Sequence, residues 1–132
     1  MRKMAADSHG RRYLADDKVK GPYLTAIESN NTLYICGQGG FGADGTMADG
    51  IRAQTRTTLE NIRQVLHECG WSLSDLVQVT CYLADIDEWA QMNAEYAAFF
   101  RDQPMVPTRT AVAVAGLPFG LRVELTCVAS RS

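Results

Sequence analysis

The chain has 132 residues, 46% of them hydrophobic and 21% charged, and a formal net charge of −2. These values are typical of one globular domain with its own core, and they exclude a disordered chain, a collagen-like chain and a small disulfide scaffold. No apolar run approaches the roughly 20 residues of a membrane helix. No apolar stretch follows the basic first residues either, so we expect a cytoplasmic protein with no secretory signal and no membrane partner.

Residues 1–20 show no clear hydrophobic period, and we expect them to form an N-terminal extension to a single domain at residues 21–132. The extension contains six basic and three acidic side chains, including every lysine of the chain. Such a segment either contacts nucleic acid or forms a solvated, partly ordered terminus. Because the rest of the chain is acidic, and nucleic-acid binding needs cations clustered on a folded face, the solvated terminus is favoured and no nucleic-acid partner is expected.

The first predicted elements form a hairpin. Residues 23–27 and 32–36 are rich in β-branched and aromatic side chains, and a cluster of turn-forming residues separates them. The segment 37–45 that follows is rich in glycine, which indicates unusual backbone dihedrals or a close approach to another group. Residues 49–69 then predict a helix, because apolar side chains recur at steps of three and four, with charged side chains on the outside.

The second half of the chain predicts three strands and a helix. Residues 76–83 alternate between apolar and polar side chains, as strand residues do. Asp85 begins a capping pattern for a second helix that extends to about Arg101. Residues 108–115 and 121–129 predict two more strands, with a turn containing glycine and proline between them.

The resulting order β-β-α-β-α-β-β predicts an α+β fold with two helices on one face of a mixed sheet. Two helices can cover only one face of the sheet. The other face would carry Val112, Val114 and Val128 beside polar groups. Because that surface is too apolar to face water, we expect it to pack against other copies of the chain.

Few residues in the sequence are suited to metal binding or to nucleophilic catalysis. The four cysteines lack CxxC spacing and the two histidines are His9 and His67, so we expect no metal. Cys69, Cys81 and Cys127 fall within apolar patterns and are predicted to be core residues. The sequence motifs of serine hydrolases, zinc proteases and phosphate-binding loops are absent, which argues against triad hydrolysis.

Two charged residues stand out by their positions in predicted strands. Arg109 comes at the start of one strand, and Glu124 lies in the last strand between Val123 and Leu125. Burying a carboxylate without a partner costs free energy of folding, so we expect Glu124 either to pair with a cation or to have a functional role. The two residues form either a structural ion pair or an anion site. In an anion site the planar guanidinium would grip a carboxylate and the glutamate would orient or deprotonate water.

Several short motifs occur together, in one register, between about residues 20 and 130. They are GPY at 21–23, LYICGQ at 33–38, QTR at 54–56 before LENI at 59–62, VQVTCYL at 77–83, NAEY at 93–96, PTRTAV at 107–112, and LP at 117–118 with VEL at 123–125. Together they resemble the RidA/YjgF family of reactive-intermediate deaminases.

The resemblance implies a chorismate-mutase-like fold of the bacillus type and a homotrimer with active sites between subunits. It also implies hydrolysis of 2-imino and 2-enamino acids, such as 2-aminoacrylate, to 2-keto acids and ammonia. The family uses no metal and no organic cofactor for this reaction. The partner expected from the resemblance is therefore a small carboxylate substrate.

The resemblance also assigns roles to individual residues. Arg109 matches the arginine that binds the substrate carboxylate, Glu124 the glutamate that positions water, and Tyr23 the tyrosine whose hydroxyl closes the pocket. The other positions that match substrate contacts are Cys36, Gly37, Asn93 and Ala111.

Departures from the family pattern cluster around this expected pocket. Cys36 stands where serine is common, and Gly39-Gly40 stands where an aliphatic residue and a proline are usual. Leu24-Thr25 replaces the usual residues after the tyrosine. A specialised relative acting on an aminomuconate-like enamine or a biosynthetic intermediate therefore remains an alternative. So does a non-catalytic trimer that binds keto or amino acids. An RNA-acting protein is disfavoured by the acidic body and the lack of an aromatic and basic platform.

Overall fold

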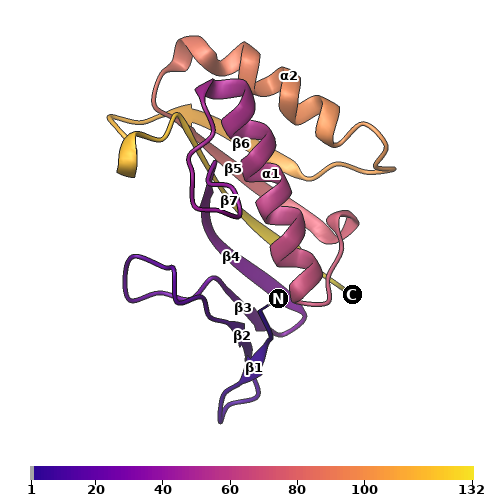
Figure 1. The fold of residues 1–132 in the computed structure, drawn as a ribbon. Coiled ribbons are helices and arrows are strands. Elements are labelled where there is room, and N and C mark those ends of the chain that lie inside the picture. Colours follow the sequence, from indigo (N-terminus) through magenta and orange to yellow (C-terminus); the bar gives the residue numbers. More distant parts are fainter. Residues whose placement is uncertain (1) are drawn as a thin grey trace.

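The computed structural model describes residues 2–132, in which a mixed seven-stranded sheet carries two α-helices on one face (Figure 1). The strands are β1 (Ala5–Ala6), β2 (Arg12–Leu14), β3 (Ala26–Ser29), β4 (Thr32–Gly39), β5 (Leu76–Leu83), β6 (Thr108–Ala113) and β7 (Val123–Ser130). The helices are α1 (Gly50–Glu68) and α2 (Trp89–Phe99), and short 3-10 turns are η1 (Leu73–Asp75), η2 (Ile86–Glu88) and η3 (Pro118–Gly120). The predicted α+β architecture is confirmed.

The strand order is β1-β2-β3-β4-β7-β5-β6, so the last strand of the chain lies near the middle of the sheet. β5 and β6 are parallel, and the other neighbours are antiparallel. Alternate residues of β7 face the helices and are buried: Val123, Leu125, Cys127 and Ala129. The apolar stripe of α1 packs on the same face, with Leu59, Ile62, Val65 and Leu66 each 1% exposed. Burial of such a side chain contributes about 1.5–3 kcal/mol to folding.

Most of the elements predicted from the sequence are confirmed, with their ends shifted by a few residues. α1, β5 and β7 lie where the periodicity indicated. The prediction of a strand over residues 23–27 is wrong, because β3 begins only at Ala26. Tyr23 lies in the preceding loop, where its backbone N–H donates to the carbonyl of Gly21 at 2.9 Å. The pairing of Leu14 on β2 with Ala26 on β3 marks where the chain returns to the sheet after this loop.

The first 20 residues contribute β1 and β2, which the sequence pattern did not predict. Leu14 at the end of β2 is fully buried in the core. Arg2 reaches the C-terminal end of α1, where its Nη2 lies 2.6 Å from Oε1 of Glu68. Its Nη1 lies 2.7 Å from Oδ2 of Asp16. This part of the chain is therefore partly ordered, and Leu14 and Arg2 attach it to the rest of the domain.

Removing the Arg2 guanidinium should destabilise the protein. The Glu68 side chain is only 2% exposed, so Arg2→Ala leaves a buried carboxylate without its charged partner. We expect the free energy of unfolding to fall by about 1–3 kcal/mol, read from urea denaturation with an unchanged slope. Arg11→Ala is the control, because Arg11 pairs with Asp7 in an exposed turn. Equal midpoints for the two variants would contradict the structural role of Arg2.

The second face of the sheet has no helix over it (Figure 1). Tyr34 and Val112 are 53% and 42% exposed on this face. Tyr34 pairs with Val128, and Val112 pairs with Tyr82, so apolar and aromatic groups form cross-strand rows there. Neither helix within residues 2–132 has the length and apolar character needed to cross a membrane.

Candidate active site

Arg109 lies on β6, at one edge of the sheet, and its side chain is on the helical face. β6 pairs with β5 so that Arg109 stands opposite Val79, which is buried under the helices. The guanidinium Nη1 donates a hydrogen bond to Oδ1 of Asn93 on α2 at 2.8 Å. Two of the predicted site residues are therefore in direct contact. Ala111 lies two residues further along β6, on the same face as Arg109 and half-buried.

Aromatic rings complete the surroundings of the Arg109 guanidinium. Its Cζ atom lies 4.6 Å from the centroid of the Tyr96 ring and 5.4 Å from that of Trp89. No ion pair within residues 2–132 involves Arg109. Since Asn93 is neutral, the positive charge is not compensated by these contacts, and the guanidinium keeps donors for an anion.

Glu124 lies on β7 and points to the other face of the sheet, opposite Tyr82 and Gly39. The carboxylate packs against the backbone of Gly37. A Cβ atom placed on Gly37 would lie 2.7 Å from Oε2 of Glu124, so only glycine leaves room for the carboxylate. Burial raises the pKa of Glu124 above its ordinary value. No cation pairs with Glu124 among the residues that the structure describes.

Gly37 belongs to an irregularity in β4. The pairing with β7 shifts between Ile35 and Gln38, which places Cys36 and Gly37 in a β-bulge. Thr126 on β7 donates its hydroxyl hydrogen to the carbonyl of Ile35 at 3.0 Å and so holds the bulge. Bulges commonly re-aim backbone and side chains next to functional sites. Here the bulge turns the Gly37 backbone toward Glu124.

Cys36 links this bulge to the loop that carries Tyr23. The backbone N–H of Cys36 donates to the carbonyl of Thr25 at 2.9 Å. Burial raises the pKa of the Cys36 thiol, which favours the neutral form. Tyr23 itself is 55% exposed. Cys36, Gly37, Glu124 and the Tyr23 loop thus belong to one neighbourhood.

The predicted site residues therefore form two separate groups. Arg109, Asn93 and Ala111 form an arginine group on the helical face, and Cys36, Gly37 and Glu124 form a glutamate group near the open face. Tyr23 lies in the loop that Thr25 joins to Cys36, and its side chain is exposed. β6 and β7 are two strands apart, and the Cα atoms of Arg109 and Glu124 are about 14 Å apart from strand spacing and rise. Their side chains point to opposite faces. The hypothesis of an Arg109–Glu124 ion pair is wrong within one chain.

The glycine-rich segment approaches other groups closely, as predicted. A Cβ atom on Gly40 would lie 2.8 Å from the Cα atom of Gln54 on α1. Asn61 on α1 donates from Nδ2 to the carbonyls of Gly39 and Phe41, at 3.0 and 2.9 Å. Helix α1 therefore fixes the segment that follows Gly37.

Sequence reasoning did not identify Trp89 and Tyr96 as neighbours of Arg109. Both were predicted to belong to an apolar stripe of the second helix, and Tyr96 is indeed buried there. Their spacing contained the missing signal, because Trp89, Asn93 and Tyr96 stand at i, i+4 and i+7 and so share one helix face. The register of β6 then places Arg109 against that face.

The buried cysteines are core residues, as predicted. Burial raises the pKa of Cys69 and Cys81 to about 11 and that of Cys127 to about 12, so these thiols stay protonated. Within residues 2–132, no group of three or more His, Cys, Asp or Glu side chains is arranged to hold a metal ion.

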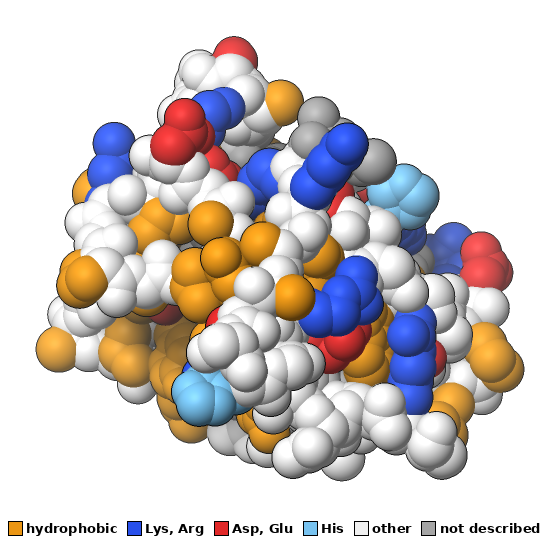
Figure 2. All heavy atoms as spheres, turned by 90° about the horizontal axis from the view of Figure 1, so that it is seen from below, with side chains coloured by type: hydrophobic (Ala, Val, Ile, Leu, Met, Phe, Trp, Pro, Cys, Tyr) orange, Lys and Arg blue, Asp and Glu red, His pale blue; other side chains and the backbone are white. Residues whose placement is uncertain are grey.

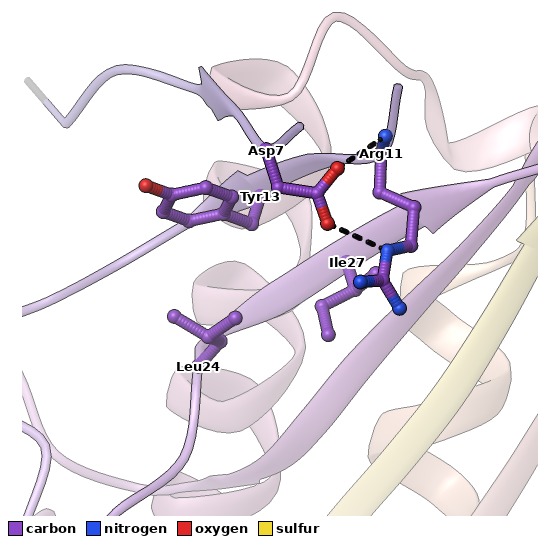
Figure 3. Close-up of a pocket in the computed structure, with 5 residues that line it drawn as sticks. All are labelled: Asp7, Arg11, Tyr13, Leu24 and Ile27. Carbon is purple, nitrogen blue, oxygen red and sulfur yellow. Dashed lines mark hydrogen bonds and ion pairs between the residues drawn. The ribbon is translucent and has the colours of Figure 1, made fainter. Parts of the chain in front are cut away.

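Two shallow hollows on the surface are lined by other residues than Arg109 and Glu124. One, of about 200 Å³, is lined by Asp7, Arg11, Tyr13, Leu24 and Ile27 around the first strands (Figure 3). The other, of about 280 Å³, lies between the outer sides of α1 and α2 and is lined by Arg56, Glu60, Glu95, Ala98 and Phe99. Neither hollow contains Arg109 or Glu124, so neither brings the two groups together.

Known proteins share this fold and sequence over most of the chain. Residues 15–131 match the family described as Endoribonuclease L-PSP. A RutC family protein of Pyrococcus horikoshii is 40% identical over 114 residues, which cover 85% of this chain and 89% of the relative.

Two solved structures illustrate the similarity in fold. RidA from an Antarctic Psychrobacter has 33% identity and a TM-score of 0.80, covering 86% of this chain and 91% of that chain. TdcF from E. coli, solved with bound serine, has 28% identity and a TM-score of 0.82 with the same coverage. Because the match includes the whole sheet from β3 to β7 and both helices, this chain belongs to the L-PSP family, which is also called the YjgF/RutC/RidA family.

Proposed function

We propose that this protein hydrolyses 2-imino and 2-enamino acids to 2-keto acids and ammonia, in sites shared between the subunits of a homotrimer. One observation carries the proposal. Arg109 and Glu124 are charged residues without charged partners among residues 2–132, and they lie on opposite faces of one sheet. A neighbouring copy that brings its glutamate group to the arginine group of this chain completes a pocket with a cation and a carboxylate.

The arginine group fits the carboxylate end of such a substrate. A guanidinium presents paired donors that match the two oxygens of a carboxylate. Asn93 holds one side of Arg109, which leaves the other donors to face a ligand. TdcF from E. coli, a relative of known structure, was solved with serine, a small molecule with the same carboxylate end.

The glutamate group fits the hydrolytic step. Water attacks C2 of the imine, R–C(=NH)–COO⁻, and one of its protons passes through Glu124 to the nitrogen, which gives the carbinolamine R–C(OH)(NH2)–COO⁻. The hydroxyl proton then passes to the nitrogen as the C–N bond breaks, giving R–CO–COO⁻ and ammonia, so one water is consumed. An imine carbon is already electrophilic and needs an oriented water and a proton route rather than a strong nucleophile. Burial raises the pKa of Glu124, which makes its carboxylate a better proton acceptor than an exposed glutamate.

The open face of the sheet supports the trimer. Tyr34 and Val112 are exposed apolar groups on the face opposite the helices. Packing of this face against neighbouring copies removes them from water and brings different faces of adjacent chains together. Mass measurement in solution tests the trimer directly.

The reaction is tested by generating 2-aminoacrylate in place with a serine dehydratase and following its decay. We expect the wild-type protein to accelerate the decay and Arg109→Ala to lose the acceleration. A panel of imines from other amino acids separates a general deaminase from a specialised one, which the departures at Cys36 and Gly39-Gly40 make relevant. Binding of 2-ketobutyrate without turnover of any imine would favour the non-catalytic alternative.

RNA cleavage is the competing activity that the family description suggests. Three of the six N-terminal basic residues are neutralised within the chain, because Arg2, Arg11 and Arg12 pair with Glu68, Asp7 and Glu28, which weakens the cationic surface that RNA binding requires. Figure 2 shows the same pattern at the end that carries these strands, with blue side chains interspersed with red ones. RNA cleavage by a pure Arg109→Ala, Glu124→Gln variant would place any such activity outside the proposed site.

Gly37→Ala should lower the activity while leaving the fold intact. The added Cβ displaces the Glu124 carboxylate, because it would lie 2.7 Å from Oε2. We expect kcat to fall about 10- to 100-fold, since proton transfer depends on the position of the carboxylate. Gly116→Ala is the matched control, because a Cβ at that position has no atom within 4 Å. Similar kcat values for both variants would contradict a role for Glu124 in proton transfer.

A further inference from the structure

Among residues 2–132, the Arg109 guanidinium has a single hydrogen bond, to Asn93. An arginine side chain has many rotamers. A single hydrogen bond from one nitrogen still allows the guanidinium to rotate about the terminal side-chain torsions. Two aromatic rings supply the remaining restraint, with their centroids 4.6 Å (Tyr96) and 5.4 Å (Trp89) from Cζ. The two rings differ in their surroundings. Tyr96 belongs to the core, whereas Trp89 is 37% exposed and lies outside the core cluster.

We propose that Trp89 is a positioning residue for Arg109: its indole ring holds the guanidinium in the orientation that binds the substrate carboxylate. This inference rests on the proposed function. Tryptophan is the aromatic side chain with the strongest attraction for a cation, and guanidinium groups pack well on its face. Trp89 is also the first residue of α2, where Asp85 fixes the preceding turn by accepting a hydrogen bond from the Asp87 N–H at 2.9 Å. The ring is therefore attached to an ordered helix end.

Kinetics separate positioning from a structural role. Arg109 binds the carboxylate equally in the ground state and in the transition state, so a misplaced guanidinium raises KM more than it lowers kcat. We expect Trp89→Leu to raise KM for 2-imino acids about threefold to tenfold, and Trp89→Phe to restore most of the loss because it keeps an aromatic face. A decrease confined to kcat, or equal KM values for Trp89→Leu and the wild type, would overturn the proposal.

The chain offers a spectroscopic test as well, because it contains only two tryptophans. Trp71 is distant from the arginine group: its ring packs on Arg131 at 3.9 Å and its Nε1 donates to Glu28 at 2.7 Å. The Trp71→Phe variant therefore retains Trp89 as its single fluorophore. We expect 2-ketobutyrate to change its fluorescence saturably, with the same Kd as calorimetry gives for the wild type.

Trp89→Phe is the matched variant, since it retains only Trp71, and its fluorescence should not respond to 2-ketobutyrate. Ligand binding seen by calorimetry without a fluorescence change in Trp71→Phe would overturn the inference and leave the proposed function intact. If the wild-type protein neither binds 2-ketobutyrate nor hydrolyses imines, the proposed function and this inference fail together.

Discussion

Mixed oligomers of Arg109→Ala and Glu124→Gln chains should recover about a quarter of the wild-type activity, although each variant alone is inactive. This result follows from the separation of the two groups within one chain. Arg109 and Glu124 lie on different strands and point to opposite faces of the sheet, so one chain does not bring them together. Each variant alone should lose at least about 100-fold in kcat/KM, because every site then lacks one of the two groups.

Recovery comes from sites that receive one intact group from each variant. A site works when the subunit supplying Arg109 is a Glu124→Gln chain and its neighbour, supplying Glu124, is an Arg109→Ala chain. With random mixing at equal amounts, each of these two conditions is met by half of the subunits. About a quarter of the sites therefore contain both intact groups. A site built within one chain would recover nothing, since every chain carries one defect.

The measurement uses the two variants denatured together and refolded, with kcat/KM per site compared with refolded wild type. Arg109→Ala mixed with the double variant is the control, because no Arg109 guanidinium is present in that mixture. Equal activity of this control and the complementing mixture would point to contaminating wild-type protein. No recovery in mixtures that form stable hetero-oligomers would refute the shared site.

The sequence was sufficient to predict most of the core elements, because their side-chain periods are strong. Ile51, Thr55, Leu59, Ile62 and Leu66 recur at helical steps and are all buried. The alternation in β5 and β7 likewise determined which side chains face the helices. β1 and β2 were missed because strands of two and three residues are too short to show a period.

The candidate residues were individually predictable, but their grouping was not. Arg109 and Glu124 stand out as charged residues in apolar strands, which the sequence alone reveals. The alternation of side chains along a strand does not show which face of the sheet the helices cover. It also does not show the order in which strands far apart in the chain lie side by side. β5 lies between β6 and β7, and only this order shows that the two side chains point apart. The bulge at Cys36 and Gly37 also depends on pairing with β7 and leaves no local signal.

The structure also links function to stability at Glu124. Burial raises the pKa of its carboxyl, so the folded state binds the proton more tightly than the unfolded state does. Between the unfolded and the folded pKa, the folded protein holds more protons, and stability therefore falls as pH rises through that window. At neutral pH the full loss of folding free energy from the ionised, partly buried Glu124 is present in the wild-type protein. Such a cost is common where a site needs a carboxylate in partly desolvated surroundings.

Glu124→Gln should therefore be inactive and yet more stable than the wild type at neutral pH. The amide has the size of the carboxylic acid but never ionises, so the cost of a desolvated charge disappears. We expect Tm at pH 7 to rise by roughly 1–3 °C. The difference should shrink as pH falls below the folded pKa, where Glu124 is protonated in the wild type as well. Calorimetric scans of both proteins from acidic to neutral pH measure this difference.

The activity of the wild type should depend on the ionisation of Glu124 too, but it should rise with pH where the stability falls. Water activation needs the ionised form of Glu124, so kcat/KM should decline on the acidic side at a pH above the ordinary glutamate pKa. Glu60→Gln provides a control, because it removes an exposed carboxylate on α1 outside both groups and should leave the pH profile of kcat/KM unchanged. A profile that stays flat down to the ordinary glutamate pKa, together with a Tm difference that does not change with pH, would show that Glu124 is not the group that exchanges the proton.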